Sequence, residues 1–104
     1  MEYAFEAGRL YLHRTPEEKA PLLLRLRRIE GQVRGLMEMI EADRYCLDEV
    51  QQANAVSAAM REVAMLVIAD HVAAGVDYAV KSGDTVGPIQ DVLAVLRAAM
   101  RQRG

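Results

Sequence analysis

The sequence predicts an all-α protein with three helices, the middle one long, and three observations lead to that prediction. Apolar residues recur every three or four positions along most of the 104-residue chain. The composition has no Trp, only one Phe and many Ala, Leu, Val and Met, which suits close helix contacts better than a β-sandwich. We identify no strand, repeat or low-complexity segment.

The chain is long enough for one domain at most. Residues 1–14 have weak periodicity and are expected to form a flexible N-terminal arm, whereas residues 15–104 are expected to form a single domain. A single Cys excludes an internal disulfide and fits a reducing compartment. No signal peptide is recognised, and we expect no apolar run to approach the roughly 20 residues of a membrane span. These features predict a cytoplasmic protein without a membrane partner.

Each helix is marked by a start signal and an apolar stripe. Thr15 as N-cap, Pro16 at the first position and Glu18 as the capping-box partner predict a helix that runs to about Glu41. Asp43 is the expected N-cap of a second helix over about 44–80, and a third helix opens at residues 87–88. The second helix is too long and apolar to stand alone, so a dimer or tetramer that forms a helical bundle is expected.

Cys46 and His71 are the most informative pair. They lie 25 positions apart in the second predicted helix. That spacing puts them about 20° apart in azimuth and roughly 37 Å apart along the axis. They cannot meet within one chain, but two antiparallel copies would place Cys46 of one opposite His71 of the other, and two-fold symmetry would build the site twice. A thiolate beside an imidazole suits a soft metal or a reactive thiol.

Simpler interpretations of these residues stay open. Cys46 could be a small buried hydrophobe, and His71 could be satisfied by a backbone or carboxylate partner. Gly75, one turn beyond His71, brings no ligand. His13 is the only other histidine and could fold over the site or remain an exposed arm residue. We find no nucleophile–base pair close in sequence and no Gly-rich phosphate loop, so the chain is not expected to be an enzyme.

A basic cluster on the first helix is the candidate DNA contact. The net charge is −2, but residues 14–34 are net basic and residues 35–50 net acidic. Arg25, Arg27, Arg28 and Arg34 are expected on the side of the helix away from its apolar stripe. They could form a solvated face or contact phosphates. No helix-turn-helix signature is present.

Residues 22–60 resemble the CsoR/RcnR/FrmR family of metal- and formaldehyde-sensing bacterial repressors, and the similarity extends over about residues 15–100. The similarity lies in the stretch RLRRIEGQVRG, the turn DRYC, the continuation QQANAV and the Asp-His pair 25 residues beyond the cysteine. The resemblance implies all-α antiparallel dimers that pair into tetramers and bind operator DNA until a ligand binds between subunits. It makes Cys46 and the partner's His71 the ligands, Tyr45 and Asp91 their supporting residues, and Arg25 and Arg61 DNA contacts.

Departures from the family pattern separate its branches. Copper sensors have a second Cys, and nickel–cobalt sensors a His, where this chain has Gly75; the early His13 is similar to one in nickel–cobalt sensors. Formaldehyde sensors lack a ligand there, but they use an N-terminal proline, whereas this chain begins Met1-Glu2. The leading hypothesis is a repressor released by Cu(I) or by Ni(II)/Co(II). The alternatives are an aldehyde or electrophile sensor that uses Cys46, and a helical interaction protein with a vestigial site.

Overall fold

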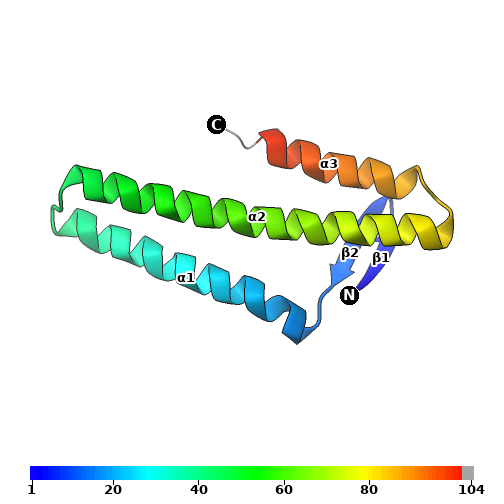
Figure 1. The fold of residues 1–104 in the computed structure, drawn as a ribbon, viewed down its shortest axis with the longest axis horizontal. Coiled ribbons are helices and arrows are strands. Elements are labelled where there is room, and N and C mark those ends of the chain that lie inside the picture. The colour runs from blue at the N-terminus through cyan, green and yellow to red at the C-terminus, as the bar shows by residue number, and fades with distance from the viewer. Residues whose placement is uncertain (102–104) are drawn as a thin grey trace. The chain divides into compact units, whose positions relative to one another are not determined.

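The computed structural model describes residues 1–101 and has three helices with a long middle one, as predicted (Figure 1). The chain order is β1 (Glu2–Glu6), β2 (Arg9–His13), α1 (Pro16–Glu41), α2 (Cys46–Ser82) and α3 (Gly87–Arg101). The chain divides into two compact units. The first contains Met1–Glu18 and the chain from Ala64 onward, the second contains Lys19–Val63, and α2 runs through both.

The N-terminal segment corrects the sequence prediction, because it forms a β-hairpin where a flexible arm without strands was expected. β1 and β2 pair antiparallel, with Phe5 opposite Leu10. The loop has only two residues, Ala7 and Gly8, with φ of 50° and 77°. Positive φ at both positions is the geometry of a type I′ turn, whose twist matches that of the paired strands. The alternation of Tyr3 and Phe5 with less apolar residues was the local signal for a strand.

The hairpin packs within the first unit. Leu10 is buried, and the ring of Phe5 lies 4.8 Å from that of Tyr78 on α2, centroid to centroid. The Tyr3 hydroxyl donates a hydrogen bond to the carboxylate of Asp77, one residue before Tyr78. A short two-stranded ribbon is marginal by itself, so these contacts with α2 account for its stability.

The start of α1 confirms the predicted capping box. The amide of Thr15 donates to Glu18 Oε1 at 3.0 Å, and the amide of Glu18 donates to Thr15 Oγ1 at 3.1 Å. The carboxylate accepts the backbone N–H of Thr15, and this contact is the main cause that lowers the pKa of Glu18. Two donors that a helix start leaves unpaired are therefore satisfied reciprocally.

Asp43 was expected to be the N-cap of α2, and this expectation is wrong. Asp43 instead ends α1. Its φ is 53°, and the amides of Asp43 and Arg44 donate to the carbonyls of Ile40 (3.2 Å) and Met39 (2.9 Å). This pattern is a Schellman motif, in which the residue after the helix takes the left-handed conformation. The carbonyl of Tyr45 then accepts from the amides of Asp48 and Glu49, so α2 begins at Cys46.

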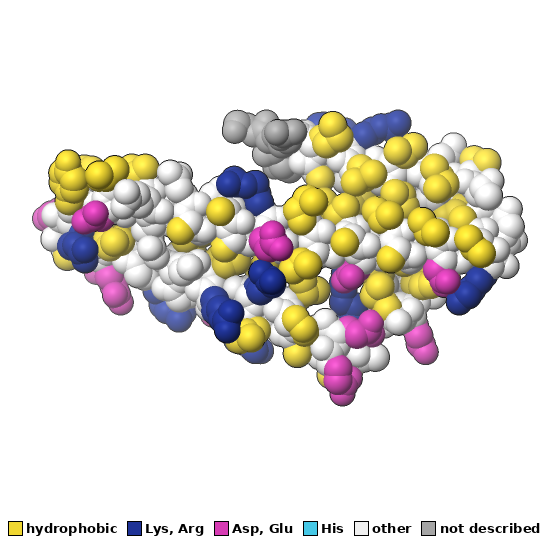
Figure 2. All heavy atoms as spheres, viewed as in Figure 1, with side chains coloured by type: hydrophobic (Ala, Val, Ile, Leu, Met, Phe, Trp, Pro, Cys, Tyr) yellow, Lys and Arg dark blue, Asp and Glu magenta, His cyan; other side chains and the backbone are white. Residues whose placement is uncertain are grey.

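Much apolar surface is exposed on this single chain. The buried hydrophobic residues among the described ones are few: Leu10, Ile29, Val63, Ala74, Ala79 and Val92. Figure 2 shows hydrophobic side chains gathered on the surface of the first unit, over α2 and α3. An 18-residue window of α2 has mean hydropathy 1.6, which by length and composition alone is enough to cross a membrane. The expectation that no run approaches a span is therefore wrong for α2, although the core helix of a bundle has the same composition.

Candidate metal centre and nucleic-acid interface

His71 lies in the second half of α2 and is held by a carboxylate from α3. Its Nε2 is 2.9 Å from Asp91 Oδ2, and the two side chains are only 12% and 10% exposed. The same Oδ2 accepts the backbone N–H of Leu10 at 3.0 Å. A carboxylate at Nε2 favours the tautomer with the proton on that nitrogen, which leaves the lone pair of Nδ1 for another partner. The pair that the resemblance named as ligand and support is thus in direct contact.

Cys46 is the first residue of α2 and belongs to the second unit. Its thiol is free and exposed, so in the single chain it is not the buried hydrophobe of the alternative interpretation. Asp48 and Glu49 occupy the same first turn, and Tyr45, directly before the helix, is 70% exposed. Cys46 is accessible to a metal, to an electrophile or to a second chain.

One protomer does not assemble a metal site within residues 1–101. No group of three or more His, Cys, Asp or Glu side chains suited to a metal ion occurs there. His13, exposed at the end of β2, does not gather with His71 and a further donor into such a group. The helix α2 is continuous from Cys46 to Ser82, so both sequence-predicted ligands lie on one unbroken helix. Their meeting across two chains stays a prediction.

The donor types fit a soft or borderline transition metal, because a thiolate and a neutral imidazole suit copper, nickel, cobalt and zinc. Position 75 adds nothing to them. Gly75 is buried, and a Cβ there would lie 2.6 Å from Val92 Cγ2 and 3.3 Å from Leu10 Cδ1. A ligand side chain at this position would require the hairpin and α3 to repack. Within residues 1–101, position 75 therefore supplies no further donor beside His71.

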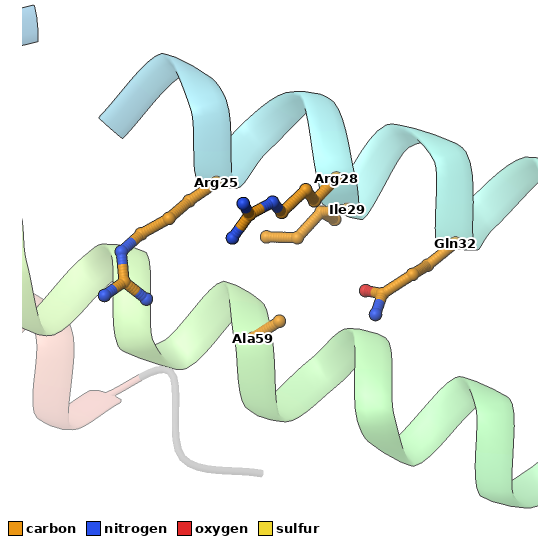
Figure 3. A pocket seen from close by; sticks show the side chains of 5 residues that line it. All are labelled: Arg25, Arg28, Ile29, Gln32 and Ala59. Atoms are coloured by element: carbon orange, nitrogen blue, oxygen red, sulfur yellow. The ribbon is translucent and has the colours of Figure 1, made fainter. Parts of the chain in front are cut away.

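The basic cluster lies in the second unit, and part of it differs from the sequence expectation. Arg25 and Arg28 reach from α1 toward α2 and line a pocket of about 140 Å³ with Ile29, Gln32 and Ala59 (Figure 3). They are therefore not on the side away from the apolar stripe, since Ile29 belongs to that stripe. Within the described part of the chain, the buried Oε1 of Gln32 has no hydrogen-bond partner.

The other predicted DNA contacts lie on exposed helix surfaces. Arg27 is exposed on α1, and Arg34 Nη1 lies 3.9 Å from Glu30 Oε1, a pair one turn apart in solvent. On α2, Arg61 Nη1 donates to Ser57 Oγ at 2.9 Å. Surface pairs of this kind contribute little to the stability of the fold. These exposed arginines therefore remain available for phosphate contacts.

The profile of a family described as metal-sensitive transcriptional repressor matches residues 18–99. The chain belongs to this family. It is 46% identical over 85 residues to the copper-sensing transcriptional repressor CsoR of Bacillus subtilis (strain 168), which covers 82% of this chain and 84% of that protein. It is 44% identical over 71 residues to the copper-sensing transcriptional repressor RicR of Mycobacterium tuberculosis (strain ATCC 25618 / H37Rv), covering 68% and 74%.

Solved structures agree with the family. The copper-sensing repressor CsoR with Cu(I) from Geobacillus thermodenitrificans NG80-2 matches with a TM-score of 0.76 and 36% identity, over 85% of this chain and 92% of that one. The nickel-responsive transcriptional regulator InrS matches with a TM-score of 0.75 and 27% identity, over 86% and 97%. The chain is thus a metal-sensing transcriptional repressor of the CsoR family, with this family's fold, and not an enzyme.

Sequence reasoning missed the hairpin's contribution to the His71 environment. Leu10 supplies both a buried side chain and the amide on Asp91, and Arg14 Nε lies 3.2 Å from Oδ2 of Asp70, the neighbour of His71. The match to the family profile begins at residue 18, after the hairpin. The apolar alternation of residues 3–12 was the available signal for the strands, but nothing local indicated where they would dock.

Proposed function

We propose that this repressor binds operator DNA as a homotetramer without ligand and releases it when a transition metal binds between two chains. Cys46 of one chain and His71 of its partner would be the ligands, His13 a candidate third, and Asp91 and Tyr45 supporting residues. The contact of His71 Nε2 with Asp91 carries this proposal, because it leaves Nδ1 as the metal-binding nitrogen. A cytoplasmic location follows from a DNA-binding role and a reduced thiol.

The inducing metal is proposed as Cu(I), with Ni(II) or Co(II) as the other option. Two relatives are named as copper-sensing, and a structural neighbour is named as nickel-responsive. A thiolate favours Cu(I), whereas imidazole is also suited to nickel and cobalt. When bound, the metal would supply bonds that join two chains, and metal binding would favour a packing state of lower DNA affinity.

DNA binding is proposed for the arginines of the second unit. Arg25 and Arg28 flank the pocket between α1 and α2, while Arg27, Arg34 and Arg61 are exposed nearby on the same two helices. Guanidinium groups bind phosphate oxygens in a bidentate manner. Replacing Arg25 by Ala should weaken binding to all DNA sequences by a similar factor. It should also reduce the slope of the logarithm of the binding constant against the logarithm of salt concentration by about 1.

A second candidate within the family is an aldehyde or electrophile sensor that uses Cys46. The exposed free thiol and the absence of a three-donor group in residues 1–101 favour it. A covalent adduct on Cys46 would then replace the metal. The family match argues against a mere helical interaction protein with a vestigial site.

Competitive metal uptake tests the proposal. Reduced protein is incubated anaerobically with Cu(I), Ni(II), Co(II) and Zn(II), desalted and assayed for metal, beside Cys46→Ala and the control Ser57→Ala. We expect stoichiometric retention of one metal by the native protein and the control, and loss in Cys46→Ala. Binding to its own promoter fragment should persist in Cys46→Ala but no longer respond to that metal.

The same experiment separates the alternatives. Failure to retain any metal, with DNA release by formaldehyde and a mass adduct on Cys46, would establish the electrophile sensor instead. Release of Cys46→Ala from DNA by the metal would contradict the assigned role of the thiolate.

A further inference from the structure

Within the first unit, the hairpin and the residue that follows it contact α2 on both sides of His71 in the sequence. Arg14 Nε lies 3.2 Å from Asp70 Oδ2, directly before His71. Six residues beyond His71, the Tyr3 hydroxyl donates to Asp77. These attachments are polar and partly exposed, whereas the contact between them, at Leu10, is buried.

Leu10 makes two different contacts at the centre of this interface. Its side chain reaches the space beside Gly75, where a built Cβ would lie 3.3 Å from Cδ1. Its backbone N–H donates to Asp91 Oδ2, the same oxygen that faces His71 Nε2. The Asp91 carboxylate thus accepts one hydrogen bond from the hairpin and orients the imidazole ring of His71 on α2.

The strand register explains why the Leu10 N–H is not hydrogen-bonded within the hairpin and can donate to a residue outside it. With a two-residue loop, Glu6 and Arg9 are the hydrogen-bonded pair that closes the turn. Pairs alternate along an antiparallel ribbon, so Phe5 and Leu10 are a non-hydrogen-bonded pair. The N–H of Leu10 therefore points outward from β2, toward Asp91.

We propose that the N-terminal hairpin is a positioning element that regulates the sensor site. When docked, the Leu10 amide fixes Asp91, and Asp91 holds His71 with Nε2 occupied and Nδ1 available to ligand. This inference rests on the proposed function of His71 but concerns a segment outside the family match, which starts at residue 18. Coupling between two sites is reciprocal, so undocking weakens ligand binding and ligand binding stabilises docking.

Three variants of the full chain separate the amide from the side chain. Leu10→Pro removes both the backbone N–H and the leucine side chain. Leu10→Ala keeps the N–H and removes the side chain beyond Cβ. Leu12→Pro is the matched control, since Leu12 pairs with Tyr3 in the same class of position and its N–H bonds no residue outside the hairpin within the described chain. Thermal unfolding monitored by circular dichroism verifies that each variant is folded.

The first measurement is the ¹⁵N NMR spectrum of the His71 ring, which shows which ring nitrogen carries the proton. We expect the Nε2–H tautomer in the native protein, Leu10→Ala and Leu12→Pro, and a mixture of tautomers in Leu10→Pro. The affinity for Cu(I) and Ni(II) should fall about 10-fold in Leu10→Pro and in neither of the other variants. A loss of about 10-fold is the lower end of the range seen when a group that orients a metal ligand is removed.

The second measurement needs no variant. Hydrogen exchange of the Leu10 amide in the native protein should slow when Cu(I) or Ni(II) is added. An unchanged His71 tautomer in folded Leu10→Pro, or a native ring already protonated on Nδ1, overturns the inference. The inference is also overturned if the metal binds and the hydrogen-exchange rate of the Leu10 amide does not change. If the native protein retains no metal, the proposed function fails, while the tautomer measurement still decides the role of the hairpin.

Discussion

Gly75 shows how one residue controls the packing of three elements. It is buried on α2, and a Cβ there would lie 2.6 Å from Val92 Cγ2 on α3 and 3.3 Å from Leu10 Cδ1 on β2. Real Cβ atoms do not approach a methyl group at 2.6 Å, so any side chain must displace α3 or the hairpin. The missing side chain is what lets both elements pack closely on this turn of α2.

We predict that Gly75→Ala destabilises the protein by about 1–3 kcal/mol, the usual cost of forcing a methyl group into a packed contact. Gly31→Ala is the control, because a Cβ at Gly31 meets only the tip of Arg34 at 3.8 Å. Gly31→Ala should stabilise α1 by roughly 0.5–1 kcal/mol. Urea unfolding of both variants measures the difference, and equal effects would show that the contact at position 75 relaxes freely.

Tyr3 and Asp77 make docking of the hairpin depend on pH. The hydrogen bond to Asp77 raises the pKa of Tyr3 to about 12, and the bond from Tyr3, followed by that from Lys81, lowers the pKa of Asp77. The raised pKa of Tyr3 means that its contribution is complete below pH 10 and lost as pH rises toward 12. The lowered pKa of Asp77 means that its contribution is lost as pH falls below the carboxyl's usual range.

We therefore expect the hairpin to loosen at both ends of the pH scale before the helices unfold. NMR signals of β1 and β2 amides followed from acid to alkali provide the measurement, with absorbance of ionised tyrosine on the alkaline side. Tyr3→Phe is the matched variant, and it should remove the alkaline transition of the hairpin near pH 12. Persistence of that transition in Tyr3→Phe would assign it to another group.

At the scale of elements, the turn between α1 and α2 depends on a left-handed residue. Asp43 has φ of 53° and ends α1 through the amides of the Schellman motif. A non-glycine residue pays a steric cost in this conformation. Asp43→Gly should thus stabilise the protein by up to about 1 kcal/mol. Asp48→Gly, inside the first turn of α2, should destabilise it by a similar amount. Thermal unfolding tests both, and a loss of stability in Asp43→Gly would refute the assignment.

The helices were predictable because their signals are local. The capping box of Thr15 and Glu18 and the apolar period of α1 each act within a few residues; the capping box is confirmed, and α1 ends at Glu41 as expected. Asp43 was misassigned because an aspartate before an apolar run resembles an N-cap, and only backbone geometry separates a cap from a left-handed end. The strands were missed because their stability comes from contacts with residues about 70 positions away, such as Tyr3 with Asp77.

The candidate site was predictable in part for the same reason. The shared face of Cys46 and His71 follows from helix periodicity, and α2 is indeed continuous between them. The contact of His71 with Asp91 needed knowledge of how α3 packs, and it entered through the family resemblance. The role of the Leu10 amide depends on strand register and on docking together, and neither can be read from side-chain types.

For the whole molecule, exposed apolar side chains indicate assembly. Along the face of α2 that carries Cys46 and His71, Val50, Met60 and Val67 are 54%, 46% and 40% exposed. α1 contributes further exposed side chains, including Met37 and Ile40. A small chain with so much exposed apolar surface would gain stability if it buried that surface against copies of itself, as in the assembly that we propose. An antiparallel seam along this face would join the Cys46 and His71 ends of two chains.

Mixed assemblies test this seam and the location of the site together. Cys46→Ala and His71→Ala chains should each retain no metal when pure. In a dimer of one chain of each kind, the His71→Ala chain supplies Cys46 and the Cys46→Ala chain supplies His71, so one of two symmetric sites is intact. Unfolding and refolding an equal mixture gives about half mixed dimers, so we expect about a quarter of native metal retention. Mass spectrometry of differently tagged chains confirms mixing, and the native protein refolded in the same way is the control. A site within one chain would give no recovery in the mixture, because neither variant carries both ligands.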